Sequence, residues 1–204
     1  MTRAILPHFR AKRSGKIVFV GSTGGWAGEV GAAPYCTTKF ALEGLFIFQP
    51  PTSRLHTHRS GYVECLQKEI AQFGIQAIIF EPGYYRTKIF SAQNCKVSPP
   101  THDDYNAIFA AMVAGVGAVD GNQRGDSAKC VERMIDVVKS EGMAAGRPIP
   151  KRLPLGPDSM EIVRTKCLET LQMCDEWKDF ICSTDLEPVK GEANKEQGQY
   201  NVTA

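Results

Sequence analysis

The chain alternates between short apolar runs and longer segments in which apolar residues recur with helical spacing. The runs at residues 16–21 and 76–81 are rich in Ile, Val and Phe and are bounded by Gly or Pro, which indicates buried parallel strands. A shorter run at residues 152–156 contains Pro154, so we expect a third strand at a sheet edge. The alternation predicts an α/β fold whose parallel sheet has about three strands flanked by helices.

Helices are predicted between and after these runs. Apolar periodicity and capping residues place them at residues 5–13, 34–45, 63–73, 103–113, 126–140 and 158–180. Pro34 suits a first helical turn, and Asp126 is a favourable N-cap. Residues 187–204 are polar and show no core-forming pattern, so we expect a disordered tail there.

Residues 46–62 interrupt a helical pattern. Pro50 and Pro51 cannot continue a helix, and a polar run follows them. When this segment is left out, apolar positions on its two sides recur in steps of three and four, as in one continuous helix: Leu42, Leu45, Leu66, Ile70 and Phe73. We therefore predict one domain over residues 1–186 that is interrupted by an insertion at about 46–62.

Composition and charge set broad limits on the class of protein. Apolar residues make up 43% of the 204 residues and charged residues 23%, which is typical of a globular domain. A net charge of +2 gives no argument for a nucleic-acid partner, and no apolar run is long enough for a membrane span. The seven cysteines include no Cys-x-x-Cys pair, so we expect free thiols in the cytoplasm. His56 and His58 have no further ligand nearby, and we expect no metal.

Three side chains could perform acid/base chemistry together. Tyr35 and Lys39 are four residues apart in a predicted helix, so they project from one face. A lysine ammonium near a phenol favours the phenolate and lowers the phenol's pKa from its ordinary value of about 10, which makes tyrosine a usable acid or base. Ser22 follows the first strand, and Thr87 follows the second. Because ligands of open α/β sheets bind beyond the carboxyl ends of strands, we expect these residues to converge on one crevice.

Two longer runs carry a family resemblance. The first, GKIVFVGSTGGWAGEVGAAPYCTTKFALEGL, resembles the core of the short-chain dehydrogenase/reductase family, with a strand, a serine and a Tyr-x-x-x-Lys motif. The second, EIAQFGIQAIIFEPGYYRT, is similar to that family's next strand and its Pro-Gly-x-x-x-Thr loop. Omitting residues 46–62 also restores the family's usual spacing between Tyr35 and Pro82. The resemblance covers roughly residues 1–185 and implies the C-terminal, catalytic half of a truncated, Rossmann-like domain.

The resemblance implies a reaction and a role for each matching residue. The reaction would be hydride transfer between NAD(P) and a small-molecule alcohol or ketone, with Tyr35 as general acid/base. Lys39 would lower the pKa of Tyr35 and hydrogen-bond the nicotinamide ribose, and Ser22 would donate a hydrogen bond to the substrate oxygen. Thr87 and the backbone at Gly83 would hold the nicotinamide carboxamide, and Pro82 would also belong to the cofactor-binding residues. Neighbouring side chains could line a substrate pocket or simply pack: Thr23, Trp26, Tyr84, Tyr85 and Phe90.

The family's N-terminal half has no counterpart before Ile17. It would bring the Gly-rich turn that cradles the pyrophosphate and the residue that selects NAD or NADP. We therefore expect a truncated chain with an exposed strand edge and weak or no dinucleotide binding, with NADP slightly preferred. The alternative is a non-catalytic remnant that acts as a binding partner of a full-length paralogue. A homodimer stays open, because the helix through which the family often pairs carries the insertion.

A second glycine-rich pattern competes for the same residues. Residues 23–28 imitate a dinucleotide fingerprint, and Glu43 lies about where a ribose ligand would follow. However, Gly31 and Pro34 interrupt the helix that should begin within the glycines, and no strand precedes Glu43. The Ser-Tyr-Lys spacing explains these residues better than a phosphate-binding loop does.

Overall fold

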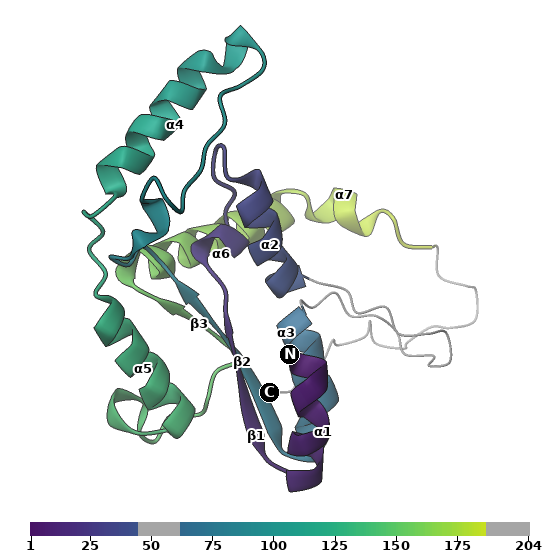
Figure 1. The fold of residues 1–204 in the computed structure, drawn as a ribbon. Helices are drawn as coiled ribbons and strands as arrows, with labels where there is room; N and C mark the ends of the chain where they lie inside the picture. The colour runs from purple at the N-terminus through teal and green to yellow at the C-terminus, as the bar shows by residue number, and fades with distance from the viewer. Residues whose placement is uncertain (45–61, 187–204) are drawn as a thin grey trace. The chain divides into compact units, whose positions relative to one another are not determined.

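The computed structural model describes residues 1–44 and 62–186, and these contain a three-stranded parallel sheet (Figure 1). Strands β1 (Gly15–Val20), β2 (Ile75–Pro82) and β3 (Arg152–Leu155) lie in the order β1-β2-β3, so β2 is central. Both pairings are parallel. The predicted α/β class with a parallel sheet is confirmed, and β3 lies at an edge as its proline indicated.

Seven α-helices occur in the described part of the chain: α1 (Thr2–Lys12), α2 (Ala33–Gly44), α3 (Tyr62–Ile70), α4 (Asn106–Val119), α5 (Ser127–Lys139), α6 (Pro157–Glu176) and α7 (Lys178–Cys182). The carboxylate of Asp126 caps α5 as predicted, because it accepts hydrogen bonds from the second and third backbone N–H groups of that helix. The largest differences from the predicted boundaries are in two of these helices. Helix α4 continues to Val119, and the segment expected as one helix at 158–180 is divided at Trp177 into α6 and α7.

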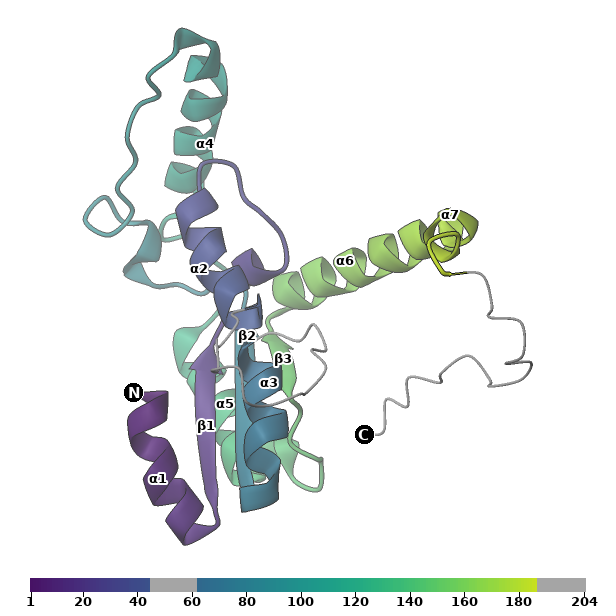
Figure 2. The ribbon, with the colours of Figure 1, turned by 90° about the vertical axis from the view of Figure 1, so that its right-hand side faces the viewer.

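The two faces of β2 point into two separate clusters of apolar side chains. Ile75, Ala77 and Ile79 pack with α3 and, more peripherally, with α1. Ile78 and Phe80 point the other way and pack with α5 and β3. Figures 1 and 2 accordingly show α1 and α3 on one side of the sheet and α5 on the other. This two-sided cover is what fixes the central strand, because alternate residues of a strand point to opposite faces.

Strand β1 is half-exposed, so the prediction that residues 16–21 form a buried strand is wrong for one face. Ile17 and Phe19 pack on the cluster around α3, whereas Val18 and Val20 are 40% and 51% exposed. This face of β1 is exposed because α5 packs on β2 and β3 instead of on β1. Among the described residues, no strand pairs with the outer edge of β1. A run of Val and Ile therefore reports hydrophobicity but not the number of neighbours that a strand has.

Helices α2 and α3 lie end to end in Figures 1 and 2, and the residues between them are 45–61. Leu42 of α2 and Leu66 and Ile70 of α3 join one apolar cluster, together with Phe73. The prediction that one helical stripe is interrupted stays a prediction, because Leu45 of that stripe lies outside the described residues. The insertion predicted at 46–62 lies almost entirely outside the described residues and stays a prediction, as does the tail at 187–204; the histidine pair at 56 and 58 also lies outside them.

The chain divides into two compact units, Met1–Lys166 and Cys167–Ala204. The first contains the sheet and the clusters described above. The described part of the second contains the end of α6 and α7, where the rings of Trp177 and Phe180 meet edge to face with centroids 5.5 Å apart. None of the described helices combines the length and the apolar content needed to cross a bilayer. None of the seven cysteines forms a disulfide, and Cys36 and Cys130 are buried.

Candidate active site

The carboxyl end of β1 delivers Ser22 into a tight turn. The backbone N–H of Gly21 still donates to the carbonyl of Phe80 on β2 at 2.7 Å, so the turn begins at the sheet. Ser22 then caps the short 3-10 helix η1 (Thr23–Gly25), and its Oγ accepts a hydrogen bond from the backbone N–H of Gly24 at 3.1 Å. This cap fixes the serine side chain at the end of the strand.

Tyr35, in the first turn of α2, reaches back to this serine. Its phenol Oη donates to the Ser22 Oγ at 3.1 Å, although the two residues are 13 positions apart. Gly24 makes the approach feasible, because a Cβ atom there would lie 3.1 Å from the Cε1 of the tyrosine ring. Tyr35 is 41% exposed, so its hydroxyl is accessible to a ligand while it is held by the serine.

Lys39 lies one helical turn after Tyr35 and points to the same end of the sheet. Its ammonium donates to the carbonyl oxygen of Val20 at 3.1 Å and lies 5.7 Å from the centroid of the Tyr35 ring. Burial lowers the pKa of Lys39 below its ordinary value, and the neighbouring carboxyl group of Glu43 opposes that shift to the extent that it is ionised. The structure therefore brings together Ser22, Tyr35 and Lys39, the three residues that the sequence placed in one centre.

The loop after β2 leaves the same edge of the sheet. The backbone N–H of Gly83 donates to the carbonyl of Leu155 at 2.9 Å, and the next N–H, of Tyr84, donates to the carboxylate of Asp158 at 2.6 Å. Both donors are thus already used inside the protein. Thr87 is exposed and caps the short helix η3 (Lys88–Phe90), where its Oγ1 accepts from the N–H of Ile89 at 3.4 Å. Its hydroxyl proton is left to donate to another group.

Tyr84 and Phe90 stack beside the tyrosine centre, with ring centroids 5.8 Å apart. The Tyr84 hydroxyl donates to Glu29 at 3.5 Å. Burial raises the pKa of Tyr84, and the negative charges of Glu29 and Asp158 and the nearby phenol of Tyr35 add to that shift. These two of the predicted pocket residues therefore form one aromatic wall near Tyr35.

The other predicted pocket residues have different surroundings. Tyr85 interacts with Cys130 and lines a cavity of about 650 Å³, together with Arg124 in the segment before α5 and Lys129 within α5. Burial and the Cys130 thiol raise the pKa of Tyr85 well above its usual range. Thr23, the first residue of η1, is buried. The ring of Trp26 lies under the guanidinium of Arg152, 4.3 Å from its centroid.

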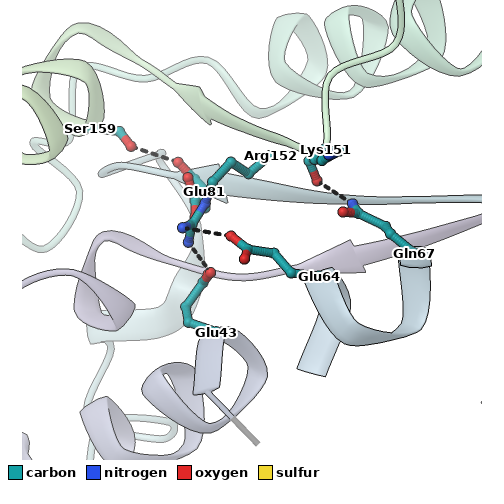
Figure 3. Close-up of polar contacts among 7 residues, drawn as sticks. All are labelled: Glu43, Glu64, Gln67, Glu81, Lys151, Arg152 and Ser159. Carbon is teal, nitrogen blue, oxygen red and sulfur yellow. Dashed lines mark hydrogen bonds and ion pairs between the residues drawn. The ribbon is translucent and has the colours of Figure 1, made fainter. Parts of the chain in front are cut away.

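Sequence reasoning missed a cluster of charged side chains next to this centre (Figure 3). Arg152, at the start of β3, donates from Nε and Nη2 to one oxygen of Glu81 at 3.1 and 2.8 Å. It also pairs with Glu43 of α2 and, at 3.5 Å, with Glu64 of α3. Glu81 is fully buried at the end of β2. Its presence in the apolar run 76–81 was the available signal, because a carboxylate in a buried strand needs a partner.

The fold and these side chains define an α/β protein with a serine, a tyrosine and a lysine at the carboxyl end of a parallel strand. Residues 1–47 match the family model described as short chain dehydrogenase. Named relatives and a solved structure of the same kind agree with that match. These matches show that the chain is similar to members of the short-chain dehydrogenase/reductase family.

The similarity extends over most of this chain but only part of its relatives. The oxidoreductase BOA17 of Botryotinia fuckeliana is 27% identical over 181 residues, which cover 88% of this chain and 57% of that protein. The NADP-dependent 3-hydroxy acid dehydrogenase of Schizosaccharomyces pombe is 33% identical over 88 residues, which cover 43% and 27%. A crystallised short-chain dehydrogenase from Streptomyces avermitilis is 27% identical, with a TM-score of 0.64 over 91% of this chain and 58% of that one. The chain thus spans about half the length of the curated relatives that it matches most extensively.

Proposed function

We propose that the protein is an NAD(P)-dependent oxidoreductase that transfers hydride between a nicotinamide and a small-molecule alcohol or ketone. The observation that carries the proposal is the hydrogen bond of 3.1 Å from the Tyr35 phenol to the Ser22 hydroxyl, with the Lys39 ammonium beside the same ring. A proton donor and a second hydroxyl at one point can both contact one reacting oxygen.

The hydroxyl group of Ser22 can donate a hydrogen bond to a substrate. Its oxygen already accepts two hydrogen bonds, from the Gly24 N–H and from the Tyr35 hydroxyl. A serine hydroxyl has two acceptor positions and one proton, so the proton of Ser22 is left for a substrate oxygen. A donor aimed at an oxygen on which negative charge develops stabilises the transition state more than the ground state.

Tyr35 would supply or remove the proton at that same oxygen. In the reducing direction its Oη gives a proton to the carbonyl oxygen, and in the oxidising direction it takes one from the alcohol. The positive charge of Lys39 stabilises the tyrosinate that forms when the proton leaves. The aromatic wall of Tyr84 and Phe90 offers an apolar surface to the substrate beside this oxygen.

The residues at this end of the sheet fit the nicotinamide half of the cofactor. Lys39 uses one N–H on Val20 and has two left for ribose hydroxyls, and Thr87 has a free hydroxyl proton for the carboxamide. Gly83 would contribute contact rather than a donor, since its N–H is bound to Leu155. The nicotinamide, when bound, supplies or accepts the hydride. A relative with NADP in its name supports a slight preference for NADP.

A second candidate function is that of a non-catalytic binding partner of a full-length relative. The observation that favours it is the uncovered side of β1, where Val18 and Val20 are 40% and 51% exposed. A strand edge with exposed β-branched side chains is suited to pairing with another chain. The glycine-rich turn after β1 leads into η1 and the serine–tyrosine pair, so it does not supply a helix N-terminus for a pyrophosphate.

Turnover by the purified chain separates the two candidates. We expect weak dinucleotide binding and slow reduction of simple ketones at millimolar NADPH. Tyr35→Phe should lower that turnover by about 10²-fold or more while cofactor affinity changes little, because the substitution removes only the proton donor. Thr38→Val is a matched control in the same helix turn, since the Thr38 hydroxyl donates to the backbone carbonyl of Tyr35 in its own helix at 2.7 Å. Undiminished turnover in Tyr35→Phe, or no turnover in the wild type at any cofactor concentration, would overturn the oxidoreductase proposal.

A further inference from the structure

We infer that Glu43 is a positioning residue of the Ser22–Tyr35–Lys39 centre, and that it acts as a neutral carboxyl which shares a proton with the buried carboxylate of Glu81. In this arrangement Arg152 ties both groups to β3. The inference rests on the proposed function, because it assigns to Glu43 the placement of the groups that perform the reaction.

Glu43 lies directly beneath the turn that carries Ser22. It follows Lys39 by one turn of α2, and its side chain packs against the backbone on both sides of the serine. A Cβ atom at Gly21 would lie 2.9 Å from the Glu43 Oε1, and one at Gly25 would lie 2.9 Å from its Cγ. Glycine at both positions therefore lets this side chain support the turn at close range.

Arg152 connects this support to the sheet. Its guanidinium contacts Glu43 and Glu81 (Figure 3). It also lies over the ring of Trp26, which directly follows η1. Helix α2, the end of β2 and the Ser22 turn thus converge on one guanidinium. The planar, multidonor shape of arginine suits several partners at once.

The charges in this cluster do not balance if every carboxyl is ionised. Glu43, Glu64 and Glu81 would carry three negative charges against the one positive charge of Arg152. The Glu64 side chain is 38% exposed and can be solvated, whereas those of Glu43 and Glu81 are 11% and 0% exposed. Burying an unpaired carboxylate is costly, so one of the two buried groups should hold a proton.

The unpaired oxygens show where that proton lies. Oε1 of Glu43 and Oε2 of Glu81 are both buried and have no partner among the donors of the described residues. One proton between the two carboxyls satisfies an oxygen of each. Burial, with repulsion from Glu81 and Glu64, raises the pKa of Glu43 from 4.5 to about 8, and Arg152 opposes the shift. Within residues 1–44 and 62–186, the remaining charged group that faces Glu43 is Lys39, from the same helix.

A shared proton makes the stability of the fold depend on pH in a defined direction. The folded protein keeps the Glu43 proton up to about pH 8, whereas the unfolded chain releases it near 4.5. Within that window the folded state binds more protons, so the stability contributed by this group is complete below the lower pKa and is lost as the pH rises through the upper one. Glutamine keeps the shape and a donor but cannot ionise.

The test compares Glu43→Gln with Glu43→Ala and with Glu69→Gln, a control on an exposed helical glutamate. Thermal unfolding is measured from about pH 5 to about pH 9. We expect Glu43→Gln to match the wild type at the acidic end and to have the higher Tm at the alkaline end, while Glu69→Gln follows the wild type throughout. A Glu43→Gln variant that loses Tm at the acidic end, or keeps the wild-type pH dependence, would show an ordinary ion pair and overturn the inference.

A second readout addresses positioning directly. The ¹³Cζ signal of Tyr35, assigned by its absence in Tyr35→Phe, should shift with the titration of Glu43 in the wild type and stay constant over that range in Glu43→Gln. Where turnover is measurable, Glu43→Ala should lower kcat by about tenfold and Glu43→Gln should retain it near neutral pH. If the ¹³Cζ signal of Tyr35 does not shift over the pH range in which Glu43 titrates, the positioning role is overturned, even if Glu43→Ala fails to fold. Absence of turnover with the signal intact would count against the proposed function alone.

Discussion

At the scale of single residues, the Ser22–Tyr35–Lys39 centre depends on side chains that already form hydrogen bonds within the protein. The Ser22 oxygen accepts two hydrogen bonds, and Lys39 is fixed by the carbonyl of Val20. Such prior contacts reduce the rearrangement that a reaction requires, because the donors are in place before the substrate arrives. The contribution of Lys39 can be tested with one substitution, because that substitution removes both its charge and its hydrogen bond.

We predict that Lys39→Met lowers turnover by about 10²-fold, the typical contribution of a group that supports proton transfer. The loss of the bond to Val20 should cost only about 1 kcal/mol of unfolding free energy. Steady-state kinetics and urea unfolding measure the two effects separately. Lys139→Met is the matched control, because Lys139 is a surface lysine that pairs with Glu141 at 3.2 Å. Equal effects of the two substitutions on turnover would remove Lys39 from the centre.

Site residues could be predicted from the sequence where the residues that they contact lie nearby in the chain. Ser22, Tyr35 and Lys39 lie close in the sequence around one strand and one helix, so spacing and family resemblance could group them. Glu43 and Arg152 are 109 positions apart and meet only because β3 pairs with β2. Neither periodicity nor composition carries that information, and a lone acidic residue in an apolar strand was the sole local indication.

At the scale of elements, capping residues predicted boundaries well where a side chain decides them. The Asp126 carboxylate accepts the N–H groups of Ala128 and Lys129 at 2.9 and 3.2 Å, and α5 begins where the sequence placed it. The burial of β1 was mispredicted because an apolar run cannot show which neighbours cover it. The same run at β2 is covered on both faces.

We predict that Asp126→Ala lowers the unfolding free energy by about 1 kcal/mol, because two N–H groups at the start of α5 lose their acceptor. Helix α5 packs on Ile78 and Phe80 of the central strand, so the loss should appear in global unfolding and not only in local fraying. Urea denaturation monitored by circular dichroism measures it. Asp120→Ala serves as the control, since Asp120 is an exposed aspartate at the end of α4. Equal midpoints for the two variants would contradict the capping role.

At the scale of the whole molecule, the parallel sheet is what turns separate motifs into one site. The strand ends of β1 and β2 meet at one edge, and α2 returns its first turn to the loop after β1. The three-stranded parallel sheet was predictable from alternating runs and helices. The division of the predicted pocket was not, because Trp26 and Tyr85 are held by Arg152 and by Cys130, residues distant in the sequence.

The central claim is that Ser22 and Tyr35 act on one oxygen, and a double-mutant cycle tests it most directly. The kcat/KM for ketone reduction is measured for the wild type, Ser22→Ala, Tyr35→Phe and the double variant, with each variant's Tm recorded to confirm folding. If the two hydroxyls work as a unit, each single change costs about 10²-fold or more, and the double variant is about as slow as Tyr35→Phe alone. Losses that multiply in the double variant would show two independent groups and contradict the account.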